Sequence, residues 1–143
     1  MRKKYNSLRA RAKKRNLPVT MSYELYCRLK MSDCYYCGIS NLLLQFYCNI
    51  MKIRTPWMSI DRADNTQGYV FNNVVPCCFL CNKIKGSFFS LEEMKKIGKE
   101  FVAPKFKVFE EEAFEEFEEW CENNTITADD EEFLEELNID QEY

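Results

Sequence analysis

The sequence predicts an α+β protein in which a small zinc-stapled core is flanked by helices. Two Cys-x-x-Cys pairs, at residues 34–37 and 78–81, stand about forty residues apart, a pattern typical of a four-sulfur structural metal site. Two short strand patterns lie between these pairs, and helical patterns occupy both ends of the chain. Each element is justified below in chain order.

The composition favours a folded intracellular protein. The 143 residues leave room for one compact domain with extensions, and 46% hydrophobic residues suffice for a packed core. The basic N-terminus is not followed by the apolar stretch of a secretory signal, and no run is long enough to span a membrane. We therefore expect a soluble protein in a reducing, cytoplasmic compartment, that of the host cell if a phage encodes the chain.

The first part of the chain predicts two helices. Residues 2–16 carry apolar side chains at helical spacing, and Pro18 ends this helix because the residue before a proline is disfavoured in helices. Ser22 as N-cap, with Glu24 in the first turn, predicts a second helix that runs to about Met31.

The middle of the chain alternates strand and turn signals. Residues 58–62 and 74–77 are predicted to be short strands, and Pro76 indicates an edge or terminal position. Residues 64–68 are a polar loop with strong turn chemistry. The apolar and aromatic residues 39–56 receive no assignment.

Helical signals return after the second cysteine pair. A helix is expected to start near Cys81 and Asn82. Ser90 and Glu93 form a capping box that opens a further helix, from Leu91 to about Phe101.

The end of the chain predicts acidic amphipathic helices. An apolar face recurs among glutamates after residue 106, and Thr127 with Asp130 can cap a further short helix. The apolar face consists of Phe109, Ala113, Phe117 and Trp120.

The zinc site is predicted to consist of Cys34, Cys37, Cys78 and Cys81. Two residues between thiolates let both reach one ion at about 2.3 Å, and two such pairs close the tetrahedral shell. A closed shell holds the fold and performs no chemistry. The alternative is that these are four free or buried cysteines. The other four cysteines are expected to be buried thiols, namely Cys27, Cys48, Cys77 and Cys121.

The net charge of −3 hides a strong asymmetry. Residues 1–30 carry a net charge of +9, residues 31–105 carry +3 and residues 106–143 carry −15. A basic arm of this kind binds nucleic-acid phosphates by releasing counterions, although it can also be a solvated charged helix. The candidate phosphate-binding residues of the arm are Arg9, Arg11, Lys13, Lys14 and Arg15.

One pattern runs through both predicted strands and the helix after them. It consists of Ser59-Ile60-Asp61-Arg62-Ala63-Asp64-Asn65, Gly68-Tyr69, Asn72-Asn73-Val74-Val75-Pro76-Cys77-Cys78 and Cys81-Asn82-x-x-Lys85-Gly86. With the Cys-x-Tyr-Cys-Gly run that starts at Cys34, it resembles the HNH (ββα-metal) endonuclease superfamily, in particular a phage and mobile-element branch. The resemblance covers roughly residues 5–101 and implies a treble-clef zinc core.

The resemblance implies a role for each matching residue. Asp61 and Asn82 would hold one catalytic divalent ion, Mg²⁺ or Mn²⁺. Asn73 would pin the loop between the strands. Lys85, with Lys83 beside it, would face nucleic-acid phosphates. Without the resemblance, the two asparagines would be interpreted as turn and helix-cap residues.

The general base is an open question in the sequence. The histidine that usually follows the strand acid in the superfamily is replaced by Arg62, and the chain contains no histidine. Arginine stays protonated, so it cannot accept the proton, but it can bind the scissile phosphate and stabilise developing charge. The candidate bases are Asp64, Tyr69 and a metal-bound hydroxide. An Asp-Arg pair can also be a simple surface salt bridge.

The sequence therefore predicts metal-dependent cleavage or nicking of DNA, or of RNA, by an HNH-like core at residues 32–104. A basic helical arm at 1–31 precedes this core, and an acidic extension at 105–143 follows it. Two other classes stay open: a non-cleaving nucleic-acid-binding zinc module, and an interaction protein such as a phage counter-defence factor. The extension would pack on the core, mask the basic arm within the molecule, or bind a protein partner.

Overall fold

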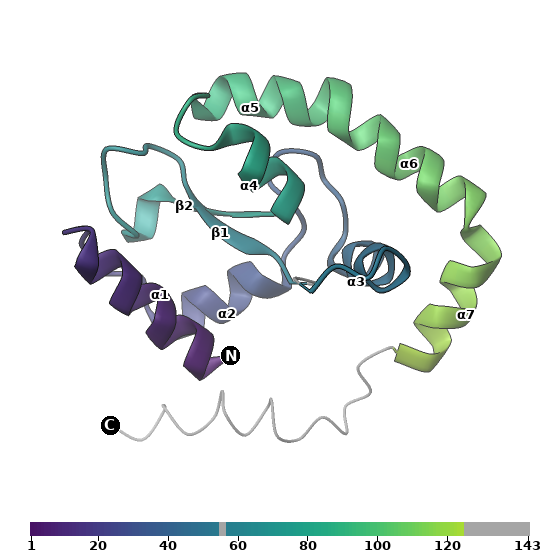
Figure 1. Cartoon of the computed structure of the whole chain (residues 1–143), viewed down its shortest axis with the longest axis horizontal. Helices are drawn as coiled ribbons and strands as arrows, with labels where there is room; N and C mark the ends of the chain where they lie inside the picture. Colours follow the sequence, from purple (N-terminus) through teal and green to yellow (C-terminus); the bar gives the residue numbers. More distant parts are fainter. Residues whose placement is uncertain (55–56, 125–143) are drawn as a thin grey trace.

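A two-stranded antiparallel sheet lies at the centre of the molecule, and helices surround it (Figure 1). The computed structural model describes residues 1–54 and 57–124. Strand β1 spans Ser59–Arg62 and β2 spans Val74–Cys77, with Ile60 opposite Pro76. Both strands are edges, so the missing N–H of the proline leaves no bond to a third strand unmade. The predicted α+β class is confirmed.

Two N-terminal helices, α1 (Arg2–Lys14) and α2 (Tyr23–Met31), pack on one side of the sheet (Figure 1). The Ser22 hydroxyl accepts a hydrogen bond from the Leu25 N–H, as the predicted N-cap requires. A cluster of buried tyrosines and aliphatic side chains joins these helices to Ile60 of β1. The buried stripe of α1 therefore fixes the helix to the sheet and leaves its cations exposed.

Helix α3 (Asn41–Ile50) lies in the segment that received no assignment. Its N-cap is Ser40, whose hydroxyl accepts a hydrogen bond from the Leu43 N–H. The helix is buried along much of its length, and Phe46 and Leu44 lie in the main core. Its buried and exposed positions alternate at helical spacing, so the signal was present and was missed among the many apolar and aromatic residues of the segment.

Helix α4 (Phe79–Lys85) begins two residues before the predicted start. The reason is its N-cap, Cys78, whose Sγ accepts a hydrogen bond from the Cys81 N–H at 3.4 Å. Because α4 follows β2 directly and packs on β1, the two strands and this helix form a ββα unit.

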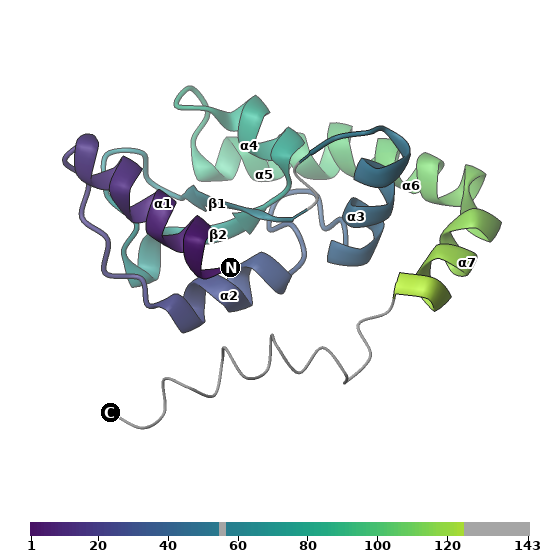
Figure 2. The same cartoon turned by 60° about the horizontal axis from the view of Figure 1, so that its bottom comes forward.

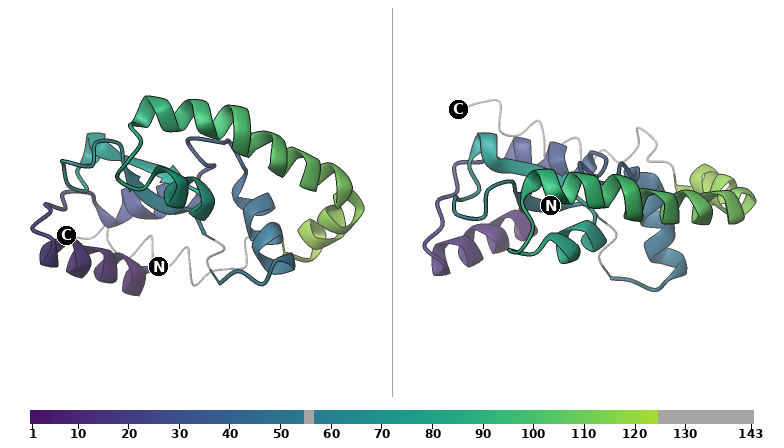
Figure 3. Two further views of the ribbon diagram at one scale, coloured as in Figure 1. Left: turned by 45° about the horizontal axis from the view of Figure 1, so that its top comes forward. Right: turned by 90° about the horizontal axis from the view of Figure 1, so that it is seen from above.

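The capping box predicted at Ser90 and Glu93 is present and opens α5 (Leu91–Ile97). The predicted end near Phe101 is wrong, because the chain continues through a π-helical turn at Gly98–Val102 into α6 (Ala103–Glu112) (Figure 3). Pro104 is tolerated there because it lies in the first turn of α6, where its missing N–H costs no helical bond. No helix in the described part of the chain is long and apolar enough to cross a membrane.

The acidic extension packs against α3. Helix α7 (Phe114–Asn124) lies beside α3 in Figure 2. The rings of Phe117 and Trp120 stand 5.3 and 5.8 Å from the ring of Phe46. The glutamates on the other faces of α7 are exposed, so residues up to 124 act as an amphipathic cover. The predicted cap at Thr127 and Asp130 lies outside the described residues.

The close approach of Gly98 to the Cys34–Cys37 loop generates a first prediction. A Cβ at Gly98 would lie 2.5 Å from the Tyr36 carbonyl oxygen, so an added methyl group must displace the π turn or this loop. We expect Gly98→Ala to lower the free energy of unfolding by about 1–3 kcal/mol, measured by urea denaturation. The exposed neighbour Lys99→Ala serves as control and should change it by less than about 0.5 kcal/mol. Equal stability of the two variants would contradict this close packing.

Candidate functional site

Four buried thiols meet at the start of α4. Cys34 and Cys37 come from the loop between α2 and α3, and Cys78 and Cys81 come from α4 and its cap. All four Sγ atoms lie within 4.8 Å of one another. Tetrahedral coordination at a Zn–S distance of about 2.3 Å requires sulfur atoms about 3.8 Å apart, and those of Cys37 and Cys78 are 3.9 Å apart. The cluster can therefore hold a metal ion such as zinc.

The backbone around the cluster closes the cysteine turn and donates a hydrogen bond to the Cys34 thiol. Gly38 adopts a φ of +74°, and its N–H donates to the Cys34 carbonyl oxygen at 2.9 Å, closing the turn. The Cys78 N–H donates to the Cys34 Sγ at 3.3 Å. Hydrogen bonds from neighbouring thiols, that of Cys37 first, hold the pKa of Cys34 below its usual value. The thiolate is the form that binds metal.

The remaining cysteines lie outside this cluster. Cys27, Cys48 and Cys77 are buried, and Cys121 is half-buried. Cys77 is the last residue of β2 and directly precedes Cys78, but its thiol is not part of the cluster. Burial raises the pKa of the Cys77 thiol, so this side chain stays protonated.

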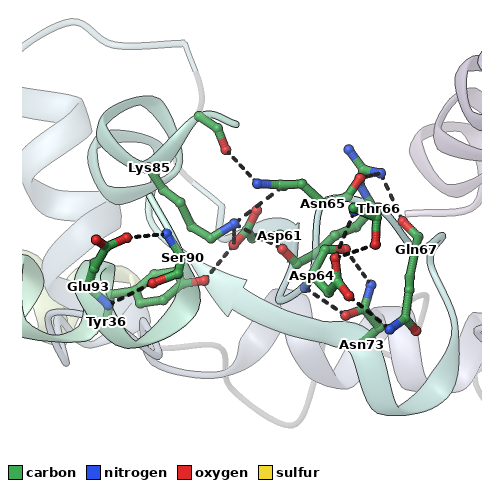
Figure 4. A network of polar contacts seen from close by, with 12 residues as sticks. Tyr36, Asp61, Asp64, Asn65, Thr66, Gln67, Asn73, Lys85, Ser90 and Glu93 are labelled. Atoms are coloured by element: carbon green, nitrogen blue, oxygen red, sulfur yellow. Dashed lines mark hydrogen bonds and ion pairs between the residues drawn. The ribbon is translucent and has the colours of Figure 1, made fainter. Parts of the chain in front are cut away.

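Asp61, in β1, is buried and held by two partners (Figure 4). Its Oδ2 accepts a hydrogen bond from the Tyr36 hydroxyl at 2.5 Å and lies 3.2 Å from the Lys85 ammonium. Tyr36 comes from the cysteine loop and Lys85 from the end of α4. Burial, followed by the hydrogen bond to Asp61, raises the pKa of Tyr36, so the phenol remains a donor to the carboxylate. This one carboxylate joins the strand, the helix and the cysteine loop.

The structure corrects the prediction for Lys85. Its side chain is fully buried and does not present its charge to a phosphate. Besides the ion pair with Asp61, the ammonium donates to the Arg62 carbonyl at 3.0 Å and to the Asn65 Oδ1 at 3.4 Å. A buried ammonium needs such acceptors, because none of the hydration it loses is otherwise replaced. Lys83, on the same helix, is exposed.

Arg62 organises the loop that follows it. One terminal nitrogen donates to the carbonyl oxygens of Asn65 and Gln67, both at 2.9 Å. The guanidinium also lies 5.6 Å from the centre of the half-buried Tyr69 ring. Arg62 therefore shapes the loop between the strands.

Asp64 is engaged by the same loop. Its carboxylate accepts hydrogen bonds from the Thr66 N–H at 2.8 Å, the Thr66 hydroxyl at 2.6 Å and the Gln67 amide at 3.0 Å (Figure 4). The bonds from Thr66 are the main cause of the lowered pKa of Asp64. A lowered pKa makes a carboxylate a weaker proton acceptor, which argues against Asp64 as the general base.

Asn73 bridges the two ends of the loop (Figure 4). Its Oδ1 accepts from the Asp64 N–H at 2.8 Å, and its Nδ2 donates to the carbonyl oxygens of Asp64 and Gly68, both at 3.0 Å. The side chain thus satisfies three buried or half-buried backbone groups at once. This is the geometry expected of a residue that pins the loop.

Asn82 lies half-buried in the middle of α4. It precedes Lys85 by three residues, so the two lie on the same side of the helix. Helical spacing therefore puts Asn82 on the face of α4 that carries Lys85, the partner of Asp61. The arm residues Arg9, Arg11, Lys13 and Lys14 are exposed on α1, and Arg15 is exposed at its C-cap.

Sequence reasoning missed two members of this network, Tyr36 and Asn65. Tyr36 lies directly before the second cysteine of the loop, and this place in the Cys-x-Tyr-Cys run was the only available signal. Asn65 carries no charge and resembles an ordinary turn residue, yet its amide also donates to the Gly86 carbonyl at 3.4 Å. The loop and α4 are therefore linked at two points, by Asn65 and by Lys85.

We compared the sequence and the fold with those of known proteins. No family model matches the sequence. Among solved structures, the rare-cutting HNH restriction endonuclease PacI is similar, with a TM-score of 0.61 and 27% identity over 71% of this chain and 75% of that chain. The chain is related to the HNH superfamily. The HNH-like fold agrees with the ββα unit and with the clustered cysteines.

A viral protein is also similar in sequence. The uncharacterized protein R423 of Acanthamoeba polyphaga mimivirus is 29% identical over 84 residues, which are 59% of this chain. The chain spans only 14% of the length of that relative.

The buried ion pair generates a second prediction. Lys85→Met leaves the Asp61 carboxylate buried without a counter-charge, so we expect it to lower the free energy of unfolding by about 3–5 kcal/mol. The double variant Asp61→Asn/Lys85→Met should cost less than the sum of the two single changes, because it removes the charge that was left unpaired. Urea denaturation of the four proteins measures this coupling. Lys83→Met is the matched exposed control, and a Lys85→Met protein as stable as that control would contradict the ion pair.

Proposed function

We propose that the protein is a metal-dependent HNH-type endonuclease that hydrolyses or nicks phosphodiester bonds in DNA. The likeness to an HNH restriction endonuclease over 71% of the chain is the observation that carries this proposal. The ββα unit supports it, because its first strand carries an acid, Asp61, and its helix carries an asparagine, Asn82, the two side chains that we propose as ligands of the catalytic ion.

The four-thiol cluster is proposed to hold zinc as a structural ion. Four thiolates complete a tetrahedral shell, so no coordination position remains for water or substrate. The cluster joins the loop between α2 and α3 to the start of α4 and lies within the main hydrophobic core. Zinc binding would then contribute directly to folding, as in other small metal-stapled domains.

The divalent ion of the reaction, Mg²⁺ or Mn²⁺, is proposed to bind Asp61 and Asn82. Carboxylate and amide oxygens are the hard donors that these ions prefer. Oδ2 of Asp61 is engaged, but its Oδ1 accepts no hydrogen bond from the residues that the structure describes. The ammonium of Lys85 opposes a second positive charge nearby, so we expect ion binding to depend on the substrate phosphate as a further ligand.

The ion would polarise the phosphoryl group and stabilise the leaving oxygen. The protein side chains have narrower roles. Arg62 stays protonated, and the nitrogens that do not bind the loop carbonyls can donate to the phosphate. Asp64 is engaged by its own loop. Among the side chains proposed from the sequence, this leaves Tyr69, beside the Arg62 guanidinium, as the candidate proton acceptor.

A specific observation favours a second candidate, a non-cleaving nucleic-acid-binding module. The carboxylate of Asp61 already has a buried counter-ion, Lys85, and the chain has no histidine. A scaffold that lost its general base could keep this ion pair to stabilise the fold and bind nucleic acid through α1. The two candidates differ in whether Asp61 is needed for cleavage or only for folding.

The proposed zinc site generates a third prediction, in which two adjacent buried cysteines provide the comparison. The purified protein is expected to contain one zinc ion per chain, measured by inductively coupled plasma mass spectrometry. Cys78→Ser should lose the ion, because it removes one of four ligands. Cys77→Ser, a change at the neighbouring buried thiol outside the cluster, should keep it. Equal zinc content in the two variants would contradict the assignment of Cys78 as a zinc ligand.

The nuclease proposal generates a fourth prediction. With added Mg²⁺ or Mn²⁺, the zinc-loaded protein should nick supercoiled plasmid, and no nicking should occur without added divalent ion. We expect Asp61→Asn and Asn82→Ala each to slow nicking roughly 100-fold or more, because each removes a proposed ligand of the ion. Asp33→Asn changes an exposed acid outside the site and should cleave normally.

Circular dichroism of each variant separates lost chemistry from lost folding, and Asn82→Ala is informative even if Asp61→Asn fails to fold. An RNA substrate is tested in parallel. If neither nucleic acid is cut under any ion condition while both are bound, the protein is the binding module.

A further inference from the structure

A cavity of about 360 Å³ opens between α1, α2 and residues 54, 57 and 59. Among the residues that the structure describes, five positively charged side chains line it and no acidic side chain does. These cations, which we call the basic cavity, are Lys3, Lys4, Arg11, Lys30 and Arg54. They come from three segments that are far apart in the sequence and that the fold brings to one place.

The cations of the basic cavity have no ion-pair partner among the residues that the structure describes. The acid of α2, Glu24, pairs with Arg28 and does not line the cavity. Like charges gathered in this way repel each other, and a bound anion relieves the repulsion.

Lys30 is the half-buried member of the set. Its ammonium donates to the Met58 carbonyl oxygen and lies 5.8 Å from the centre of the Tyr26 ring. Burial, followed by the charges of Lys4 and Arg11, lowers the pKa of Lys30 to about 8, and the nearby Cys77 opposes this shift. A bound anion would therefore favour the charged form of Lys30.

We propose that the basic cavity binds a backbone phosphate of a nucleic acid, at a distance from the phosphate that would be cut. This rests on the proposed function and adds to it a second binding site, beside the first residue of β1. Half-buried Trp57 lines the cavity and offers an aromatic face to the adjoining sugar or base.

The position of the cavity fits a continuous strand of nucleic acid. Ser59, the first residue of β1, also lines the cavity and precedes Asp61 by two residues, about 7 Å along a strand. A polynucleotide that reaches Asp61 would therefore bring a neighbouring phosphate to the cavity. The exposed cations of α1 continue the positive surface beyond it.

The test measures binding of a fluorescein-labelled DNA duplex by anisotropy, without added divalent ion and over a range of salt concentrations. We expect Lys4→Ala/Arg54→Ala to weaken binding roughly 10-fold and to lower the slope of log affinity against log salt by about 1, because one phosphate contact is lost. The matched control is Lys96→Ala/Lys105→Ala, which removes the same charge from exposed positions on α5 and α6. If both double variants bind alike, the proposal is overturned.

A pH series adds a readout that a structural role would not move. The groups that face Lys30 are Lys3, Lys4 and Arg11 of α1, Tyr26 of α2, Arg54 and the nearby Cys77. A bound phosphate favours the charged lysine, so affinity should fall as pH rises through about 8, where the free protein loses this proton. Lys30→Arg keeps its charge and should bind with little change between pH 7 and 9. An equal fall in both proteins would overturn the role of Lys30.

Two further arms separate this proposal from its alternatives. Inorganic phosphate is titrated by calorimetry, and saturable binding that Lys4→Ala/Arg54→Ala abolishes, with unchanged duplex affinity, would assign the cavity to a free anion and not to nucleic acid. The second arm measures plasmid nicking and duplex binding on the same preparation of the unaltered protein and of the cavity variant. Binding that depends on the cavity, without any cleavage, would contradict the nuclease proposal and leave the cavity proposal standing. Cleavage by the unaltered protein, with duplex binding unchanged in the cavity variant, would contradict the cavity proposal and leave the nuclease proposal standing.

Discussion

The buried ion pair between Asp61 and Lys85 is the interaction on which the arrangement of the core depends. It fixes the end of α4 against β1, and the hydrogen bond from Tyr36 adds the cysteine loop to the same carboxylate. A buried ion pair contributes little net stability, because the cost of removing two charges from water offsets their attraction. Its effect is on geometry, since any arrangement that separates the two groups leaves a charge buried and unpaired. The ion pair therefore specifies how helix, strand and loop meet.

Helix α4 connects two centres of different character. Its seven residues span about 10 Å, with the thiol cluster at one end and Lys85 at the other. Cys78 is both a member of the cluster and the N-cap of the helix, so metal binding and helix formation would support each other. A metal at the cluster would set the position of α4 and, through Lys85, the position of Asp61. An ion that performs no chemistry would in this way control the site where chemistry is proposed.

The parts of the fold that could be predicted are those that local chemistry determines. Cysteine spacing indicated the thiol cluster, hydroxyl caps indicated the starts of α2 and α5, and short apolar runs indicated both strands. Helix α3 was missed although its Ser40 cap and its helical periodicity were present, because its apolar and aromatic residues also suit a strand. Helix α4 begins earlier than predicted because a thiol acts as its cap. Lys85 was placed at the surface because lysines are almost never fully buried without a partner. Its partner is distant in the sequence, and only the folded chain brings them together.

The charged residues that would attract nucleic acid lie apart from those proposed for catalysis. Within the ββα unit, Asp61 is neutralised by Lys85, the Asp64 carboxylate is engaged by its loop and Arg62 binds loop carbonyls, so this site has little free charge with which to attract a polyanion. Positive charge is concentrated on α1 and in the basic cavity, where none of the five lining cations forms an ion pair with another described residue. Affinity for nucleic acid would then be set there and would respond to salt, whereas Asp61 would matter for catalysis and for folding. Helix α1, which packs beside the sheet, thus supplies positive charge for binding, whereas the charges of the ββα unit are paired within that unit. Nucleic-acid binding and the proposed catalysis can therefore change independently.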